Sequence, residues 1–270
     1  MLAPGRRMRI VSHDRPAALV IAHPGHELRV YNWLSLVHPR VFVLTDGSGH
    51  SRKSRLHRTT GILNSLGVRK GTIYGRLTDL DFYSAILAHQ VELFIGIAGE
   101  LAEALVRERI EYIVGDALEG YNPVHDVCRL IINAAVKKAC EMGSCIENFD
   151  VLLADKLADP TQAAMTDIIS IGADEQMLAE KLRVARDYSE LAADVNRVLA
   201  QEGIASLGTE YLRPVNENSY NELLQEPPYY EVYGEKQVAA GRYQQVIRYH
   251  DHVFPIGEAL QGFSRGLSVR

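Results

Sequence analysis

The chain has few cysteines, no long apolar run and no excess of basic residues, and each absence excludes a class of protein. Its 270 residues include three cysteines, none of them in a Cys-x-x-Cys pair. Such a sparse, odd set argues against a disulfide framework and indicates packing residues in a reducing, cytoplasmic setting. No apolar stretch approaches the ~20 residues that a membrane span needs. The formal net charge of -5 leaves no footprint for nucleic acid.

A Gly-x-Gly-x-x-Gly motif after a strand is missing as well, which disfavours a dinucleotide-binding enzyme. What remains is the composition of an ordinary globular protein, with 47% hydrophobic and 23% charged residues. The first 16 residues, MLAPGRRMRIVSHDRP, are basic but contain no apolar core. We therefore expect residues 1–16 to form a short arm and not a signal peptide.

Short aliphatic runs alternate with helical patterns through the first 150 residues. The sequence predicts strands at 17–22, 40–45, 71–75 and 111–116, and helices at 51–66, 85–108, 124–142 and 174–202. Continuous apolar strands that alternate with helices are typical of a parallel sheet covered on both faces. We therefore expect a Rossmann-like α/β domain over residues 17–200.

Residues 201–270 are richer in tyrosine, proline and asparagine, and we expect an irregular C-terminal extension packed on the same domain. The stretch 245–255 predicts one further strand, on which His250 and His252 would alternate. A surface strand explains that pair, and a second metal site is the alternative. Tyr229, Tyr230 and Tyr233 could line a pocket, contact another subunit of a homo-oligomer, or pack in the interior.

Two histidines, His23 and His26, follow the first predicted strand directly, in the stretch LVIAHPGHELRV. Ligands of parallel α/β sheets bind beyond the carboxyl ends of the strands, and neutral imidazole is a common ligand of zinc and related metals. The same spacing also suits two histidines that only cap a helix. His125 starts a helix after another strand, so it can lie at the same sheet edge, and three protein ligands are usual at catalytic zinc.

Several motifs around these histidines resemble those of a known family. They are Ala22-His23-Pro24-Gly25-His26-Glu27, Thr45-Asp46-Gly47, SRLHRTTGILNSLGV at 54–68, and Asn122-Pro123-Val124-His125. They stand where the PIG-L/LmbE family of metal-dependent sugar N-deacetylases has Ala-His-Pro-Asp-Asp-Glu, Thr-Asp-Gly, an Arg-rich helix ending in Leu-Gly-Val, and His-Pro-Asp-His. The later KLRVARDYSEL at 181–191 is similar to the family's Lys-x-x-x-Ala-x-x-Tyr helix.

The resemblance implies a metal site and a hydrolytic reaction. Carried over residue by residue, it assigns Zn²⁺, or another divalent metal, to His23, His26 and His125, with a histidine at 26 in place of the family's aspartate ligand. It implies hydrolysis of an N-acyl (N-acetyl) group on a small sugar-containing substrate. Three imidazoles remain a workable zinc site, with more net positive charge at the metal.

The chain departs from the family at the residues that carry out the chemistry. Gly25 stands where the family has its general base, and Asn122 and Val124 replace two residues that stabilise the oxyanion and orient groups at the metal. A general base typically contributes about 10²–10⁴-fold to the rate, so ordinary deacetylation should be severely slowed unless other groups substitute.

Residues at strand ends and beside the ligands are the candidate substitutes. Asp46 and Asp116 are the candidate bases, although turn or helix capping explains both equally well. Asn122 could donate a hydrogen bond to the oxyanion. Arg55 and Tyr121 are candidates for binding substrate.

Two other functions remain open from the sequence. One is a degenerate deacetylase-like protein that binds a sugar or a partner without turnover, which the glycine at position 25 favours. The other is a three-histidine site for iron, nickel or another ion with non-hydrolytic chemistry, because metal affinity order alone does not decide the metal.

Overall fold

A seven-stranded sheet forms the centre of the protein. The computed structural model describes residues 14–153, 168–215 and 226–265, so the expected arm at 1–16 lies almost wholly outside the described residues. The strands are β1 (Ala17–Ile21), β2 (Arg40–Thr45), β3 (Lys70–Leu77), β4 (Tyr112–Asp116), β5 (Glu147–Val151), β6 (Ile169–Gly172) and β7 (Thr209–Pro214). They lie in the order β3-β2-β1-β4-β5-β7-β6. The four predicted strands are confirmed.

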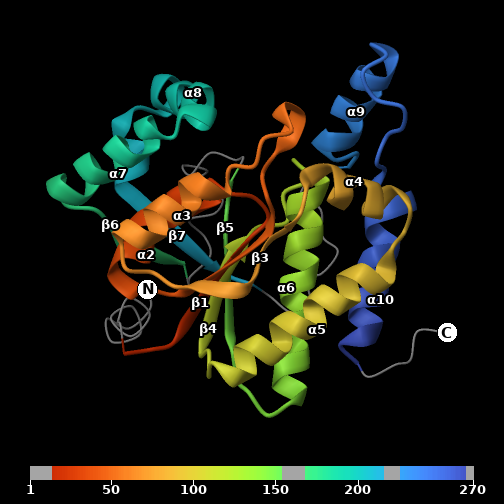
Figure 1. The fold of residues 1–270 in the computed structure, drawn as a ribbon, viewed down its shortest axis with the longest axis horizontal. Coiled ribbons are helices and arrows are strands. Elements are labelled where there is room, and N and C mark those ends of the chain that lie inside the picture. The colour runs from red at the N-terminus through yellow and green to blue at the C-terminus, as the bar shows by residue number, and fades with distance from the viewer. Residues whose placement is uncertain (1–13, 154–167, 216–225, 266–270) are drawn as a thin grey trace.

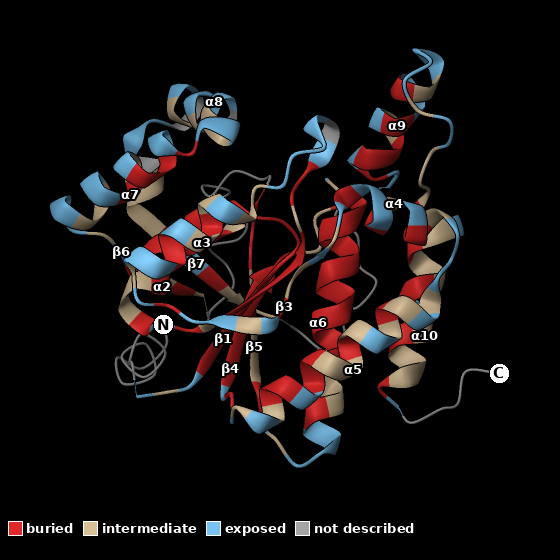
Figure 2. Cartoon of the chain, viewed as in Figure 1, coloured by how far each residue is buried: buried red, intermediate tan, exposed pale blue. Residues whose placement is uncertain are grey.

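Strands β1 to β5 are parallel, and β7 runs antiparallel to both β5 and β6. On β1, Ala18 and Val20 pack with α4 (Asp79–Leu87), α5 (Val91–Arg107), α6 (Pro123–Glu141) and α10 (Phe254–Phe263). The alternate residues Leu19 and Ile21 pack with α2 (Tyr31–Val37), α3 (Leu56–Ser65) and α7 (Glu175–Asp187). Helices therefore cover both faces, and β1 and β4 are buried throughout (Figure 2). The predicted α/β class is confirmed.

Two predicted helices are each divided in two, so their predicted continuity is wrong. The stretch 85–108 contains the end of α4 and all of α5, because the chain turns at His89, whose φ is 49°. The stretch 174–202 contains α7, the short η4 (Ser189–Leu191) and α8 (Ala192–Glu202). The break lies at Tyr188, which leaves helical geometry with a ψ of 79° and is 1% exposed. The Tyr188 ring is buried in the core, and the helix ends at this residue instead of continuing through it.

The C-terminal part is more regular than the sequence predicted. It contributes β7 to the sheet, and α9 (Tyr229–Ala239) and α10 to the helical layers. The strand predicted at 245–255 is wrong, because a π-helical turn at Tyr249–Val253 leads into α10. Tyr249 and Val253 are both buried, and their spacing of four residues suits a helix. His250 and His252 therefore do not alternate on a strand, and His252 stacks on His89 with ring centroids 5.2 Å apart.

The remaining whole-chain expectations concern membranes and cysteines. No helix in the described residues combines the length and apolarity needed to cross a membrane. Cys128 is buried, as expected of a packing residue, whereas Cys140 and Cys145 are exposed.

Helix α4, whose first residue is Asp79, begins with a capping box. Thr78 accepts a hydrogen bond from the Asp81 backbone N–H, and the Asp81 carboxylate accepts one from the Thr78 N–H. Replacing Thr78 by Ala is expected to lower the free energy of unfolding by about 1 kcal/mol, because the N-cap acceptor is lost. Urea denaturation measures the change, and Thr78→Ser, which keeps the hydroxyl, serves as the control. Equal stability of the Ala and Ser variants would contradict the assignment.

Candidate metal centre

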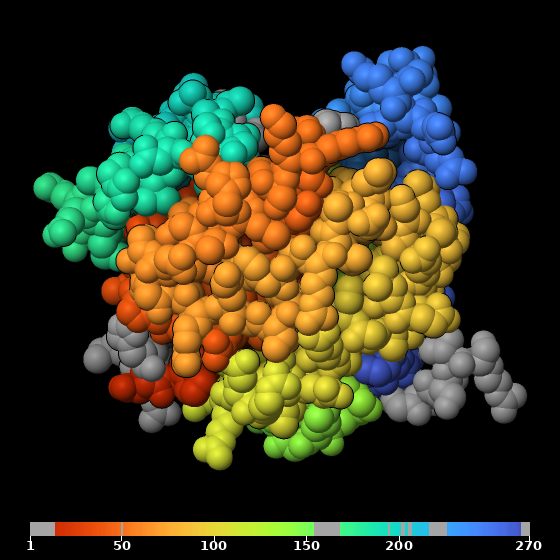
Figure 3. Space-filling model, viewed as in Figure 1, coloured from red at the N-terminus to blue at the C-terminus, as the bar shows by residue number. Residues whose placement is uncertain are grey.

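Three histidines from two distant segments meet at the carboxyl edge of the sheet. His23 follows β1, His26 opens the short η1 (His26–Val30), and His125 lies in the first turn of α6. The ring centroid of His23 lies 5.3 Å from that of His26 and 5.1 Å from that of His125, and the last two are 4.6 Å apart. Above this edge α7 and α8 stand on one side and α9 on the other (Figures 1 and 3).

A buried carboxylate orients His23. The Nδ1 of His23 lies 2.9 Å from Asp79 Oδ1 and 2.8 Å from Thr45 Oγ1. Asp79 also accepts hydrogen bonds from the Thr45 hydroxyl and the Gly49 backbone N–H. Burial by itself would raise the pKa of Asp79, but the hydrogen bonds from His23, Thr45 and Gly49 hold that pKa well below its usual value. A charged carboxylate on Nδ1 directs the Nε2 of His23 toward any ligand.

A second carboxylate orients His26 in the same way. Asp116, at the end of β4, is fully buried, and its Oδ2 lies 2.9 Å from His26 Nδ1 and accepts a hydrogen bond from the Ala22 N–H. Its Oδ1 is buried and has no hydrogen-bond partner among the described residues. Burial lowers the pKa of His26, although the nearby Asp116 acts in the opposite direction.

His125 has no such partner. Its Nδ1 is buried without a hydrogen bond to any described residue. Burial, and then the neighbouring His26 and His23, lower the pKa of His125 well below its usual value, so its imidazole is neutral. An orphaned ring nitrogen in a buried site indicates a group that something else should satisfy.

The donor chemistry of this cluster fits a divalent metal. Ligating histidines are neutral, and their second nitrogen typically donates to a carboxylate, which is the arrangement at His23 and His26. In the described part of the chain, however, no group of three or more histidine, cysteine, aspartate or glutamate side chains already converges on one point that could hold an ion. Binding by all three imidazoles therefore requires their rings to turn toward a common ion.

Gly25, between the first two histidines, is enclosed by the segment after α7. Its φ of 110° lies in a region that side chains disfavour, and an added Cβ would overlap Leu191 Cδ1 and lie 3.6 Å from the Tyr188 hydroxyl. The Tyr188 hydroxyl is buried with no hydrogen-bond partner in the described residues. The place where the resembling family carries an aspartate is thus occupied by a leucine from η4.

Glu27 supports this turn from inside. It is fully buried, and its two oxygens accept hydrogen bonds from the Gly25 N–H at 2.7 Å and the Thr59 hydroxyl at 2.7 Å. Burial raises the pKa of Glu27, although these hydrogen bonds act against the shift. Glu27 therefore holds the loop that carries His23 and His26.

The four other predicted site residues lie in two different settings. Asp46 and Arg55 belong to the loop after β2, where Asp46 Oδ1 accepts from the Ser48 N–H and Arg55 Nε donates to the Gly47 carbonyl. One oxygen of Asp46 thus caps a turn, which is the alternative that the sequence left open. Asn122 caps α6, with its Oδ1 accepting from the Val124 N–H and the Tyr83 hydroxyl, so its Nδ2 carries the donors left for a ligand. Tyr121 is 44% exposed, and its ring lies 6.5 Å from that of His125.

Sequence reasoning missed Asp79 and Tyr188. The rule that selected Asp46 and Asp116 as strand-end carboxylates applies to Asp79 too, because β3 runs to Leu77 and not to the predicted end at 75. Tyr188 is the tyrosine of the family-like KLRVARDYSEL stretch, but its prediction within a continuous helix concealed the break and its place beside Gly25.

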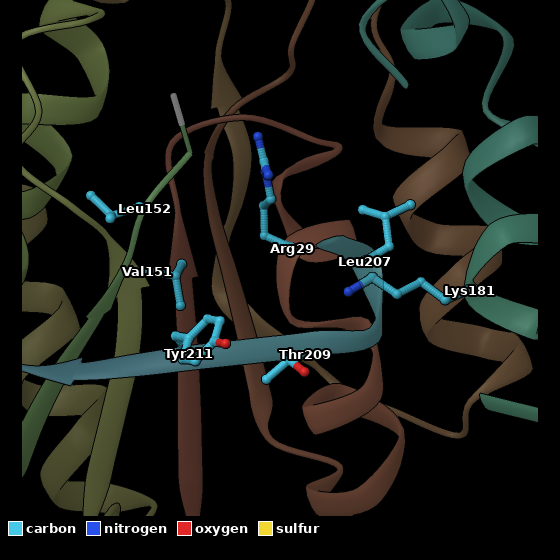
Figure 4. A pocket seen from close by; sticks show the side chains of 7 residues that line it. All are labelled: Arg29, Val151, Leu152, Lys181, Leu207, Thr209 and Tyr211. Carbon is cyan, nitrogen blue, oxygen red and sulfur yellow. The ribbon is translucent and has the colours of Figure 1, made fainter. Parts of the chain in front are cut away.

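None of the three histidines lines the small cavity of the structure. It has a volume of about 20 Å³ and is lined by Arg29, Val151, Leu152, Lys181, Leu207, Thr209 and Tyr211 (Figure 4). This is room for about one water molecule. The cavity is too small to be the substrate site.

The fold and the cluster together describe an α/β protein with three clustered histidines at the carboxyl edge of its sheet. No family model matches the chain, and no curated protein matches it significantly. Among solved structures it is similar to A40926 pseudoaglycone deacetylase, with 15% identity, a TM-score of 0.48, and coverage of 75% of this chain and 97% of that one.

Two other solved structures show a similar likeness. The zinc-inhibited form of teicoplanin deacetylase shares 12% identity, with a TM-score of 0.46 and coverage of 74% of this chain and 99% of that one. A conserved protein from Thermus thermophilus shares 18% identity, with a TM-score of 0.46 and coverage of 73% and 92%. Deacetylases are thus among the matched structures. A likeness at this level concerns the outline of the fold and assigns no activity.

Proposed function

We propose that the protein is a metal-dependent hydrolase that removes an N-acyl group from a sugar-containing substrate. The observation that carries the proposal is the meeting of His23, His26 and His125 at the carboxyl edge of the sheet, two of them with a carboxylate on Nδ1. These three imidazoles would hold the ion. When bound, a divalent metal in such a site polarises an acyl oxygen and activates water.

The surrounding residues take separate roles in this proposal. Asp79 and Asp116 are positioning residues, because each holds the Nδ1 of a histidine and is almost fully buried. Asp46 is the candidate base, because it is only partly buried. The turn engages its Oδ1 through the Ser48 N–H, so the proton transfer is assigned to Oδ2. Asn122 Nδ2 donates to the acyl oxygen, since Oδ1 is already engaged. Arg55 and Tyr121 contact the rest of the substrate.

The test begins with the purified wild-type protein. Elemental analysis is expected to find a divalent metal bound in a fixed ratio to the chain. Amine release from N-acetylated sugars should stop when a strong chelator removes the ion and return when the ion is restored. Protein that binds no Zn²⁺ or other divalent ion would overturn the proposal.

A protein that binds its ligand without turnover is the second candidate. It is favoured by the closure of the Gly25 position, where an added Cβ would overlap Leu191 Cδ1 unless that side chain turned away. Stoichiometric metal together with no amine release from any N-acetylated sugar would select this alternative over hydrolysis.

A further inference from the structure

A second, larger cavity lies among α2, α3 and α7, on the face of the sheet that these helices cover (Figure 1). It has a volume of about 250 Å³, and none of the three clustered histidines lines it. Drug-sized ligands occupy sites of about 300–1,000 Å³, so this cavity suits a smaller molecule. The residues that line it are Tyr31, Asn32, Ser35, Ser65, Leu66, Asp174, Gln176, Met177 and Glu180.

A buried carboxylate joins two walls of this cavity. Glu210 on β7 accepts hydrogen bonds from the Asn32 and Trp33 N–H groups at the start of α2, each at 2.8 Å. The same carboxylate pairs with Lys181 of α7 at 2.7 Å, and both side chains are buried. The walls formed by α2 and α7 are therefore set before any ligand binds, which limits the loss of freedom that opposes binding.

The amide of Asn32 is the feature that indicates a ligand. Asn32 is 0% exposed, and neither its Oδ1 nor its Nδ2 has a hydrogen-bond partner among the described residues. A buried amide without partners costs free energy of folding and requires an explanation. Because the amide carries an acceptor beside a donor, the group that satisfies it must carry a donor beside an acceptor.

A ligand reaches this buried amide when neighbouring side chains turn aside. Gln176, Met177 and Glu180 of α7 line the same cavity, and all three are unbranched and rotate about several bonds. Gln176 and Glu180 are exposed and Met177 is partly buried, so the α7 wall carries the side chains that can move. The Asn32 amide therefore lies at the floor of the cavity, beneath an adaptable wall.

The hydroxyl groups of the lining are acceptors toward a ligand. The Ser35 hydroxyl donates its hydrogen to the Asn32 carbonyl at 2.8 Å. The Ser65 hydroxyl donates to the Ile62 carbonyl, also at 2.8 Å. Each oxygen thus keeps only its acceptor capacity, which favours a ligand that presents further donors to α2 and α3.

The charges at the cavity disfavour an anion. Asp174 and Glu180 line it, and the described lining residues include no lysine, arginine or histidine. Arg183 pairs with Glu180 and offsets that charge from outside the cavity. Asp174 engages only its Oδ1, as the N-cap of α7. A phosphate or carboxylate would therefore meet an uncompensated negative charge at Asp174.

We propose that this cavity is a second ligand site, for a neutral small molecule that carries a hydrogen-bond donor beside an acceptor on one edge. Nucleobases and carboxamides have such an edge, and asparagine pairs with the N6/N7 edge of adenine through two hydrogen bonds. Asn32 holds this edge, and Leu66 and Met177 offer apolar contacts to the rest of the molecule. The site is independent of the function proposed for the metal centre.

The test uses isothermal titration calorimetry of the full chain with adenosine and nicotinamide, which represent the two sources of the edge. Binding of either supports the site and identifies the source. For adenosine, N6,N6-dimethyladenosine lacks the donor and should bind about 5- to 150-fold more weakly. AMP should also bind more weakly than adenosine, because its phosphate adds negative charge beside Asp174. Binding of neither adenosine nor nicotinamide would overturn the proposal.

Asn32→Leu removes the amide at nearly constant size. It should abolish the binding of whichever ligand the wild type binds, and should raise the midpoint of thermal unfolding without ligand, because no amide is left unpaired. Asn133→Leu is the matched control. Asn133 is also buried, but its Oδ1 accepts from Asn148 Nδ2 at 2.9 Å, so this variant should lower the midpoint and keep the ligand affinity.

Two results with these variants would contradict the site. Wild-type affinity in Asn32→Leu would show that the amide does not hold the ligand. A midpoint lowered as far by Asn32→Leu as by Asn133→Leu would show that the Asn32 amide already has a partner. Neither result touches the proposed hydrolase, which depends on metal content and amine release.

Discussion

Gly25→Asp, which restores the aspartate of the resembling family, is expected to destabilise the protein by about 2–6 kcal/mol and not to restore a base. A side chain at a φ of 110° costs about 1–3 kcal/mol in backbone strain. Its Cβ would also overlap Leu191 Cδ1, and such overpacking costs a further 1–3 kcal/mol or so. The new carboxylate would lie beside the buried Glu27, which disfavours its charge.

The control isolates the steric part of this loss. Gly143 has a φ of 92°, and no heavy atom of the described residues outside its own vicinity lies within 4 Å of an added Cβ. Gly143→Asp therefore carries the strain without the overlap and should cost about 1–3 kcal/mol. Urea denaturation compares the two variants, and Leu191→Ala should recover part of the loss in the Gly25→Asp background. Equal costs at positions 25 and 143 would show that Leu191 does not close the site.

The sequence predicted β1, β2 and β4 most directly, because nearly all of their residues are buried on both faces of the sheet. β1, with its five buried aliphatic residues, is the plainest example. β7 could not be predicted, because its pattern contains Glu210, which reads as a surface residue but is 1% exposed. Its carboxylate accepts from the Asn32 and Trp33 N–H groups at the start of α2 and pairs with Lys181 at 2.7 Å. These partners are distant in the sequence and no local pattern reveals them.

The candidate site shows the same division. The three histidines could be selected because each lies at a strand end or helix start, where a parallel sheet gathers its ligands. The surroundings of Gly25 could not be predicted, because Tyr188 and Leu191 reach it from a helix break more than 160 residues later in the chain. Periodicity alone favours a continuous helix there, since Leu182, Ala185 and Tyr188 continue one apolar face. What the sequence omitted is therefore the enclosure of Gly25, whereas the three clustered histidines themselves could be selected from it.

Loss of metal is the expected result of His125→Ala, and a weaker site is the expected result of Asp116→Asn. His125 is one of the three proposed ligands, so its removal should take metal below a stoichiometric level. Asp116→Asn should lower metal affinity about 10- to 100-fold, the usual effect of losing a partner behind a ligating histidine. Elemental analysis after dialysis and competition with a chromogenic chelator measure both effects.

The physical reason for the Asp116→Asn effect lies in the two ways an asparagine can fit. If its oxygen takes the place of Oδ2, it keeps the hydrogen bonds from Ala22 and His26, but its NH₂ group enters the buried place of Oδ1, which has no partner among the described residues. If it is turned over, the NH₂ group faces His26 Nδ1, and the ring proton must move to the nitrogen that should bind metal. His89→Ala is the matched control, because His89 stacks on His252 and does not belong to the cluster of three histidines. The His89→Ala protein should keep the metal content of the wild type. Unchanged affinity in a folded Asp116→Asn protein would show that His26 is not held for a metal by this carboxylate.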